Sequence, residues 1–147
     1  MKRSSIATES TVVRESNGEY WYDENGLLHR NDGPALKLHN GSEYWYRHGK
    51  RHREDGPAVI DSTGTREWHV NGHYHRENGP AAIFPNGDTF WYKHGKLHRE
   101  DGPAAILRGE RQHWYLDDKL IPHDVDNFEE AWELLVKEYG VKEIMES

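Results

Sequence analysis

A histidine–arginine pair returns at a fixed interval along most of this 147-residue chain. The segments LHRNDGPA, RHREDGPA, YHRENGPA and LHREDGPA begin at Leu28, Arg51, Tyr74 and Leu97, and each start lies 23 residues after the one before. A period without drift is the signature of a stacked array, in which each unit packs against its neighbours. The chain is therefore expected to fold as a row of similar small units.

The repeat defines two rows of equivalent residues, which we interpret as structural. A feature present in every unit usually serves the architecture of the repeat. Regularly repeated aromatic side chains are more often core than ligand contacts, so the tryptophan row is predicted to be core. Trp21 belongs to that row but is one residue out of phase. The two rows are His29, His52, His75 and His98, and Trp45, Trp68, Trp91 and Trp114.

Each unit contains two short β-favouring runs. One is aromatic, such as Glu43 to Tyr46, and stops at His48-Gly49; the other follows the Asp-Gly-Pro triplet, such as Ala58 to Ile60. Proline cannot donate a hydrogen bond to a β-ladder, so a long loop should leave the sheet around each Asp-Gly-Pro. The predicted fold class is mainly β: an elongated antiparallel meander of repeated β-hairpins with a C-terminal capping α-helix.

The boundaries of the array follow from where the pattern stops. Residues 1–10 form an N-terminal tail, residues 11–121 the hairpin array and residues 122–147 a helical cap. Asp126 and Glu129 form a capping-box pattern. Repeat arrays need closed ends, so we favour a cap over a partner-binding or dimer helix. Apolar residues follow at helical spacing: Phe128, Ala131, Trp132, Leu135, Val136 and Tyr139.

Composition limits the classes of partner. A hydrophobic content of 34% and a mean hydropathy of -1.07 would suggest disorder, but six Trp, eight Tyr and three Phe can bury enough area for an ordered fold. The net charge is -7 and no basic block is present, so DNA and an anionic membrane are poor partners. The chain has no cysteine, no signal-peptide pattern and no membrane-length apolar run, and a cytoplasmic location is expected.

The repeated His-Arg-x-Asp/Asn motif could suggest catalysis or metal binding. Geometry opposes a shared metal site, and a motif present in every repeat usually serves the architecture; a hydrolase would require the His/Asp pairs, such as His52 with Asp55, to be catalytic. Equivalent histidines on neighbouring units should lie about 10 Å apart, which is too far to share one zinc ion. We therefore expect no metal, no cofactor and no enzymatic activity. Each row histidine is followed by an arginine, and these arginines are expected to pair with glutamates of neighbouring loops. The arginines are Arg30, Arg53, Arg76 and Arg99, and the glutamates Glu54, Glu77 and Glu100. The alternative is that converging loop arginines bind a small anionic ligand or nucleotide.

Partner specificity in repeat proteins usually lies where units differ. The predicted function is therefore non-enzymatic binding of another protein. Open sheet edges at Val12 and near Leu120 would also allow a homodimer. The residues predicted to contact the partner are Arg47, His48, His69, Tyr74, Tyr92, Lys93 and His94.

The unit resembles the MORN repeat, a 23-residue hairpin module with an aromatic strand followed by a Gly-Lys-x-His turn. Residues 49–52 and 95–98 match that turn, and Tyr46 and Tyr92 hold the aromatic position. The chain departs from the family after the histidine, where Arg-Glu-Asp-Gly-Pro-Ala replaces a glycine pair. This MORN-like variant is similar to repeats of bacteriophages, large viruses and antitoxin-like proteins. The resemblance implies binding without catalysis, for example inhibition of a host or toxin protein in the host cytoplasm.

Overall fold

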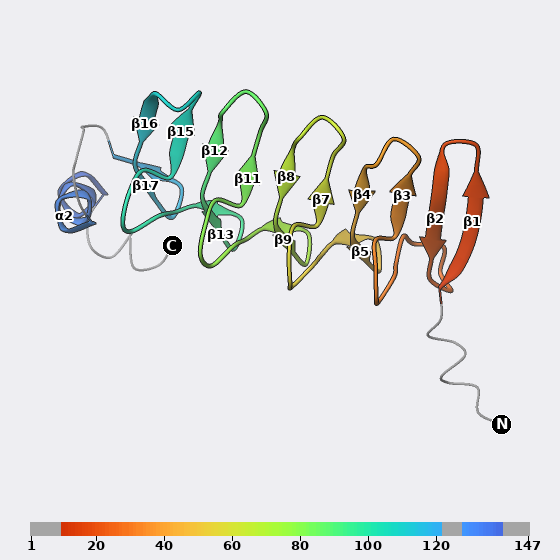
Figure 1. The fold of residues 1–147 in the computed structure, drawn as a ribbon. Helices are drawn as coiled ribbons and strands as arrows, with labels where there is room; N and C mark the ends of the chain where they lie inside the picture. The colour runs from red at the N-terminus through yellow and green to blue at the C-terminus, as the bar shows by residue number, and fades with distance from the viewer. Residues whose placement is uncertain (1–9, 122–127, 140–147) are drawn as a thin grey trace. The chain divides into compact units, whose positions relative to one another are not determined.

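The computed structural model describes residues 10–121 and 128–139. It confirms the predicted fold class, because the chain forms antiparallel β-hairpins followed by one short helix (Figure 1). The N-terminal tail, apart from Ser10, and the predicted capping-box residue Asp126 lie outside the described residues. The chain divides into two compact units, residues 1–73 and 74–147, which we describe separately.

The first unit contains one antiparallel sheet and a separate two-stranded hairpin. Its sheet opens with five directly paired positions of β1 and β2, from Thr11 opposite Tyr22 to Glu15 opposite Gly18. In order across the sheet the strands are β1 (Thr11–Glu15), β2 (Gly18–Tyr22), β3 (Leu36–Leu38), β4 (Glu43–Tyr44), β7 (Val59–Ile60) and β8 (Arg66–Glu67). The hairpin is formed by β5 (Tyr46–Arg47) and β6 (Lys50–Arg51), and β9 (His69–Val70) follows β8.

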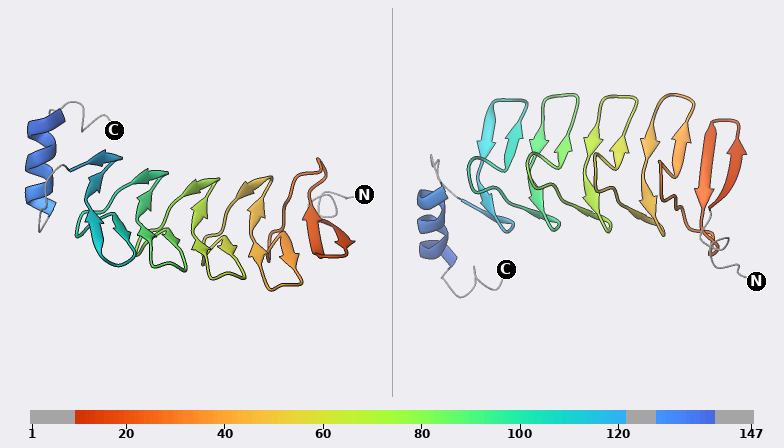
Figure 2. Two further views of the ribbon diagram at one scale, coloured as in Figure 1. Left: turned by 90° about the horizontal axis from the view of Figure 1, so that it is seen from above. Right: turned by 60° about the horizontal axis from the view of Figure 1, so that its bottom comes forward.

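The second unit repeats this arrangement, as the views in Figure 2 show for β11 to β18. Strand β10 (His73–Tyr74) lies at the junction of the two units. The sheet order is β11 (Ala82–Ile83), β12 (Thr89–Phe90), β15 (Ala105–Leu107) and β16 (Arg111–His113). Two separate hairpins accompany it: β13 (Tyr92–Lys93) with β14 (Lys96–Leu97), and β17 (Tyr115–Leu116) with β18 (Lys119–Leu120).

Most aromatic runs are interrupted at their tryptophan, which differs from the sequence expectation of a single strand. Trp45 separates β4 from β5, and these two strands belong to different sheets. The backbone N–H of Trp45 donates to the Ala58 carbonyl (2.7 Å), while the Trp45 carbonyl accepts from the His52 N–H (3.1 Å). The tryptophan thus forms a corner whose backbone groups are satisfied outside the main ladder. What the sequence suggested as one long loop, residues 49–57, begins with strand β6.

The hairpins close through two-residue turns with left-handed backbone at both positions. His48 and Gly49 have φ of 48° and 83°, and His94 and Gly95 have φ of 53° and 81°. This is the backbone of a type I′ turn, which matches the twist of the flanking strands. In the last hairpin Asp118 replaces the glycine and adopts φ of 68°. Hairpins also bond to one another within a unit, for example Gly49 N–H to the Leu28 carbonyl (2.8 Å).

The core is built from small residues, and the tryptophan row lies only partly within it. The alanine after each Asp-Gly-Pro or Asn-Gly-Pro is fully buried: Ala35, Ala58, Ala81 and Ala104. Trp114 is buried, whereas Trp45, Trp68 and Trp91 are half-buried. The tryptophan row therefore lies in the core only at Trp114, which differs from the expectation that the whole row is core. One face of the Trp45 ring and one face of the Trp91 ring are covered by an arginine guanidinium.

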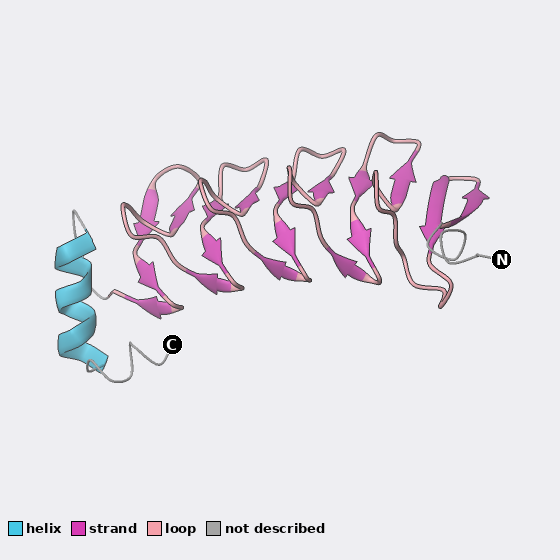
Figure 3. Ribbon diagram, turned by 90° about the horizontal axis from the view of Figure 1, so that it is seen from below, coloured by secondary structure: helices cyan, strands magenta, loops and turns pink. Residues whose placement is uncertain are grey.

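Helix α2 (Phe128–Tyr139) packs on the last hairpin of the second unit (Figure 3). Ala131 is fully buried in a cluster with Trp114, Leu116 and Ile121, and Trp132, Leu134 and Val136 pack against this cluster. Leu116 lies at the position that Arg47, Val70 and Lys93 hold in earlier hairpins, and in the last hairpin this apolar side chain packs in the cluster that contains Ala131 of the helix. The described helix is neither long enough nor apolar enough to cross a membrane.

Candidate functional site: the grooves beside the HRxDGP loops

The segment from His52 to Pro57 and its equivalents, here called the HRxDGP loops, are held together by their arginine. The Arg53 guanidinium carbon lies 3.8 Å from the centre of the Trp45 ring, Nε donates to Asp55 (2.9 Å) and Nη1 donates to the Pro57 carbonyl (3.1 Å). Arg99 repeats all three contacts with Trp91, Asp101 and Pro103. A planar, five-donor guanidinium is suited to such combined stacking and bonding.

The glycine of the loop provides room for this guanidinium. A Cβ atom placed on Gly56 would lie 2.9 Å from the Arg53 Cζ atom, and one placed on Gly102 would lie 2.6 Å from the Arg99 Cζ atom. Gly33 and Gly79 approach Arg30 and Arg76 equally closely. The guanidinium is therefore sandwiched between the tryptophan ring and the glycine backbone. This explains why Arg, Gly and Trp recur together at one period.

The carboxylates of the loop do not pair as the sequence suggested. We expected the arginines to pair with Glu54, Glu77 and Glu100 of neighbouring loops, but Arg30, Arg53 and Arg99 bond the Asp of their own loop. The glutamates instead face the histidine two residues earlier, as in His75–Glu77 (2.8 Å) and His98–Glu100 (3.0 Å). The Arg–Asp pairing is local because Nε and the Asp carboxylate lie on the same turn of chain. It lowers the pKa of Asp55 through its hydrogen bond with Arg53.

Two equivalent grooves lie beside these loops, one in each unit. Groove 1, of about 310 Å³, is lined by residues of the loops at 29–34 and 52–57 together with Trp45 and Arg47. Groove 2, of about 430 Å³, is lined by residues of the loops at 75–80 and 98–103 together with Trp91 and Lys93. Each lining residue of groove 2 lies 46 residues, or two periods, after its counterpart in groove 1. The groove is therefore a property of the repeat.

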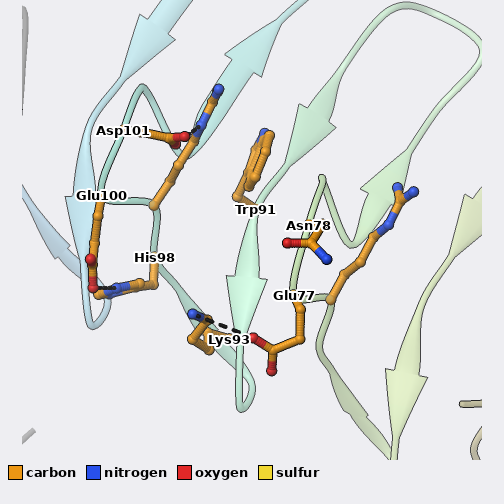
Figure 4. A pocket seen from close by; sticks show the side chains of 9 residues that line it. Glu77, Asn78, Trp91, Lys93, His98, Glu100 and Asp101 are labelled. Carbon is orange, nitrogen blue, oxygen red and sulfur yellow. Dashed lines mark hydrogen bonds and ion pairs between the residues drawn. The ribbon is translucent and has the colours of Figure 1, made fainter.

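The two grooves share a floor and differ at the rim. Six of the nine lining positions, here called the floor, carry the same residue in both: the Trp, the His, two Arg, one Glu and one Asp. The other three, here called the rim, are Asn31, Asp32 and Arg47 in groove 1 and Glu77, Asn78 and Lys93 in groove 2. Figure 4 shows Lys93 reaching across groove 2 to Glu77, at an Nζ–Oε1 distance of 3.7 Å. This lysine and His75 lower the pKa of Glu77, with the His75 hydrogen bond as the larger cause.

The carboxylates are the most exposed charges of the loops. The side chains of Asp55 and Glu54 are 81% and 74% exposed, against 20% for Arg53. The guanidinium is thus withdrawn against its tryptophan while the acids face solvent. In groove 1 the exposed cation is Arg47 on β5. A ligand entering groove 1 would therefore meet Arg47, the loop carboxylates and the side chain of Trp45.

Six of the seven predicted partner-binding residues lie at least partly at the surface. Arg47 and Lys93 line the grooves. His48 and His94 occupy the adjacent turns and are exposed. Tyr74 and Tyr92 stack on each other at 4.7 Å and are half-buried, and burial raises the pKa of Tyr92.

His69 differs from the other six because it is buried, with 4% exposure, and offers little surface to a partner. Its Nε2 lies 2.9 Å from Glu67, which also accepts from Arg51 Nη1 (3.2 Å). The other repeats carry Tyr or Phe in place of Glu67, except for His113 in the last one. They carry Tyr in place of His69 and Leu or Tyr in place of Arg51. The three substitutions occur together because each polar side chain satisfies another. Sequence reasoning overlooked Arg51, although its departure from the leucine of equivalent units was the available signal.

A second unit-specific contact lies beside groove 1. Asp23 Oδ2 is 2.8 Å from His48 Nδ1, and the Asp23 side chain is 6% exposed. This bond, together with the backbone N–H groups of Leu27 and Asn25, lowers the pKa of Asp23. The His48 ring also stacks on His29 at 3.9 Å. The residues DENG, which put Trp21 out of phase, thus supply the acceptor that orients His48.

The four repeated histidines, here called the framework histidines, each lie at the start of an HRxDGP loop: His29, His52, His75 and His98. Within residues 10–121 and 128–139, no three His, Asp or Glu side chains gather closely enough to hold a metal ion. Within one His-Arg-x-Asp motif, His52 is engaged with Glu54 and Asp55 with Arg53. Comparison of the chain with family models, with curated proteins and with solved structures finds no match, so the resemblance to the MORN repeat stays a prediction from the sequence.

Proposed function

We propose that this chain is a non-enzymatic protein-binding repeat module that uses grooves 1 and 2 and their rims. The observation that carries the proposal is the recurrence of the same groove, at the same nine positions, in both units. A constant floor with a varied rim is how repeat proteins combine one scaffold with partner specificity. Arg47, His48, Lys93 and His94 would form the variable contacts.

The framework residues support this proposal because their polar groups are already used internally. Arg53 and Arg99 each make a ring contact and two hydrogen bonds within their own loop. His52 and His98 contact both a glutamate and a backbone N–H. Such groups hold the groove in shape, while the floor supplies a half-buried tryptophan and the rim supplies charged side chains of both signs. Aromatic and arginine side chains of this kind often dominate protein interfaces.

Binding of a small anionic ligand or nucleotide is the second candidate and has less support. It requires several loop arginines to converge on one point, whereas Arg30, Arg53 and Arg99 point into their own loops. In groove 1 an anion would meet Arg47 together with three loop carboxylates. The MORN-like pattern extends the proposal to an inhibitor of a host or toxin protein acting in the cytoplasm.

Charge reversal at the groove rim tests the proposal. A photo-crosslinking amino acid at His94 would be used to capture partners from lysate, with Arg47→Glu/Lys93→Glu as the test variant. Lys37→Glu/Arg111→Glu is the matched control, because both residues are exposed on sheet strands and line neither groove. We expect one stoichiometric protein, lost from the test variant and retained by the control.

Equal capture by both variants would contradict the proposal. A rise in melting temperature with inorganic phosphate or a nucleoside triphosphate, in the absence of any protein partner, would favour the small-ligand reading instead. Circular dichroism of both variants establishes that a loss of capture is not a loss of fold.

A further inference from the structure

Each framework histidine accepts a hydrogen bond from the turn of the next hairpin. In every case the acceptor is Nδ1 and the donor is the backbone N–H of the first turn residue, 19 positions later. The four pairs are His48 N–H to His29 (2.9 Å), Asn71 to His52 (3.0 Å), His94 to His75 (2.9 Å) and Asp117 to His98 (3.2 Å).

This geometry assigns a neutral ring with its proton on Nε2. A histidine nitrogen that accepts a hydrogen bond carries no proton, so Nδ1 must be bare and Nε2 must donate. The neighbouring carboxylates fit that assignment, because Nε2 of His52, His75 and His98 faces the glutamate two residues later. At His29 and His75 a second proton would have to enter at Nδ1, where it would face the backbone N–H of the turn, whereas Nδ1 of His98 also lies 3.3 Å from the Asp117 carboxylate, which would accept such a proton. A protonated ring therefore cannot hold the turn in this way.

Two of these turns belong to the groove rims. His48 follows Arg47 of groove 1, and His94 follows Lys93 of groove 2. The turn residues are non-glycine residues with left-handed backbone, a conformation that persists only where surrounding contacts stabilise it. Each also places its own ring against the framework histidine: His48 stacks on His29 at 3.9 Å, and His94 lies tilted against His75 at 4.4 Å. Two stacked imidazoles cannot both carry charge without mutual repulsion.

We propose that mild acid releases the groove turns, so that grooves 1 and 2 bind their partner at neutral pH and lose it as His29 and His75, which hold these turns, take up a proton. The effect on binding rests on the proposed function, but the release of the turns does not and is tested on the protein alone.

The groups around His29 favour this reading on balance. Burial lowers its pKa most, and the charges of His48 and Arg47 lower it further, whereas Asp23 and a hydrogen bond with Asn31 raise it. A histidine whose pKa is lower in the folded state than in the unfolded chain stabilises the fold at neutral pH. That contribution is lost as pH falls below the unfolded value of 6.5. Around His75 the charged and titratable neighbours are Glu77, Lys93 and His94.

The test is amide hydrogen exchange measured by NMR between about pH 7.5 and about pH 5.5, the range in which histidines change charge. After correction for the intrinsic effect of pH, the N–H groups of His48 and His94 should lose protection by about fivefold, the loss expected for one hydrogen bond. The Trp45 and Trp91 N–H groups, which donate to Ala58 and Ala104, should keep theirs. Two-dimensional spectra of the rings should show the Nε2–H tautomer at the higher pH.

A matched variant separates titration from simple loss of a contact. His29→Asn/His75→Asn places an amide oxygen where Nδ1 lies and cannot be protonated, so the turn amides should become insensitive to pH. His39→Asn is the control, because His39 is exposed and its side chain makes no such bond. Unchanged protection at the lower pH, or an Nδ1–H tautomer at neutral pH, would overturn the acid-release proposal. Neither outcome bears on whether the grooves bind a protein.

Discussion

The Arg99 guanidinium lies between the Trp91 ring and Gly102, so we predict that replacing Gly102 even by alanine will destabilise the fold. Gly102→Ala would bring Cβ to 2.6 Å from the Arg99 Cζ atom, so the guanidinium must move. Arg99 would then lose its stack on Trp91 and its bonds to Asp101 and the Pro103 carbonyl. The stack contributes about 0.5–1 kcal/mol, the part-buried carbonyl bond about 1–1.5 and the exposed ion pair about 0.5. We expect a loss of about 2–3 kcal/mol in the free energy of unfolding.

A double-mutant cycle makes this reasoning refutable. Arg99→Ala should cost a similar amount, because it removes the same three contacts, and Gly102→Ala should add little in that background because the methyl group then has room. Urea unfolding followed by tryptophan fluorescence gives the four free energies. Gly26→Ala is the control for backbone strain alone, since no atom lies within 4 Å of its Cβ position and its φ is +81°. Additive losses of Gly102→Ala and Arg99→Ala would show that the glycine is not there for the guanidinium.

Three further predictions concern other parts of the chain. The triple variant Arg51→Leu/Glu67→Tyr/His69→Tyr installs side chains found in other repeats and should leave the free energy of unfolding unchanged or raise it by about 1–4 kcal/mol. Arg51→Leu alone should destabilise the fold in the same urea assay, and the opposite ranking would contradict the inference that the three polar side chains satisfy one another. Ala131→Glu should lower the unfolding temperature, because a fully buried position cannot hold an unpaired charge, and it should expose the Trp114 cluster. The exposure would appear as a red shift in tryptophan emission, and an unchanged spectrum would mean that the helix does not cap the array. Hydrogen bonds from Thr63 and from the Tyr44 hydroxyl lower the pKa of Asp61, so the ionised Asp61 stabilises the fold above the ordinary pKa of 3.8, and this stabilisation is lost as pH falls below that value. Asp61→Asn should therefore reduce the fall in unfolding free energy at acid pH, and an unaltered fall would exclude this contribution.

The sequence alone determined the unit and its local chemistry. The 23-residue spacing predicted an antiparallel hairpin array, because strictly equivalent residues imply equivalent environments. The His48-Gly49 pair correctly ended an aromatic strand, since the preference for a left-handed turn is encoded in two adjacent residues. Helical spacing after residue 126 placed a helix, and Ala131 and Trp132 turned out to lie on its packed side.

Tertiary structure decided which equivalent residues meet. A period states that His29 and His52 have the same neighbours, but it does not name a neighbour 19 residues away, such as the N–H of His48 for His29. Stacking of Arg53 on Trp45 similarly depends on the corner that the tryptophan backbone makes between two sheets. The sequence could not distinguish buried His69 from exposed His48, because both depart from the repeat and only packing decides which of them finds a buried carboxylate. Contacts between successive 23-residue repeats form only when the repeats fold against each other, so the grooves and the histidine hydrogen bonds cannot be read from one repeat alone.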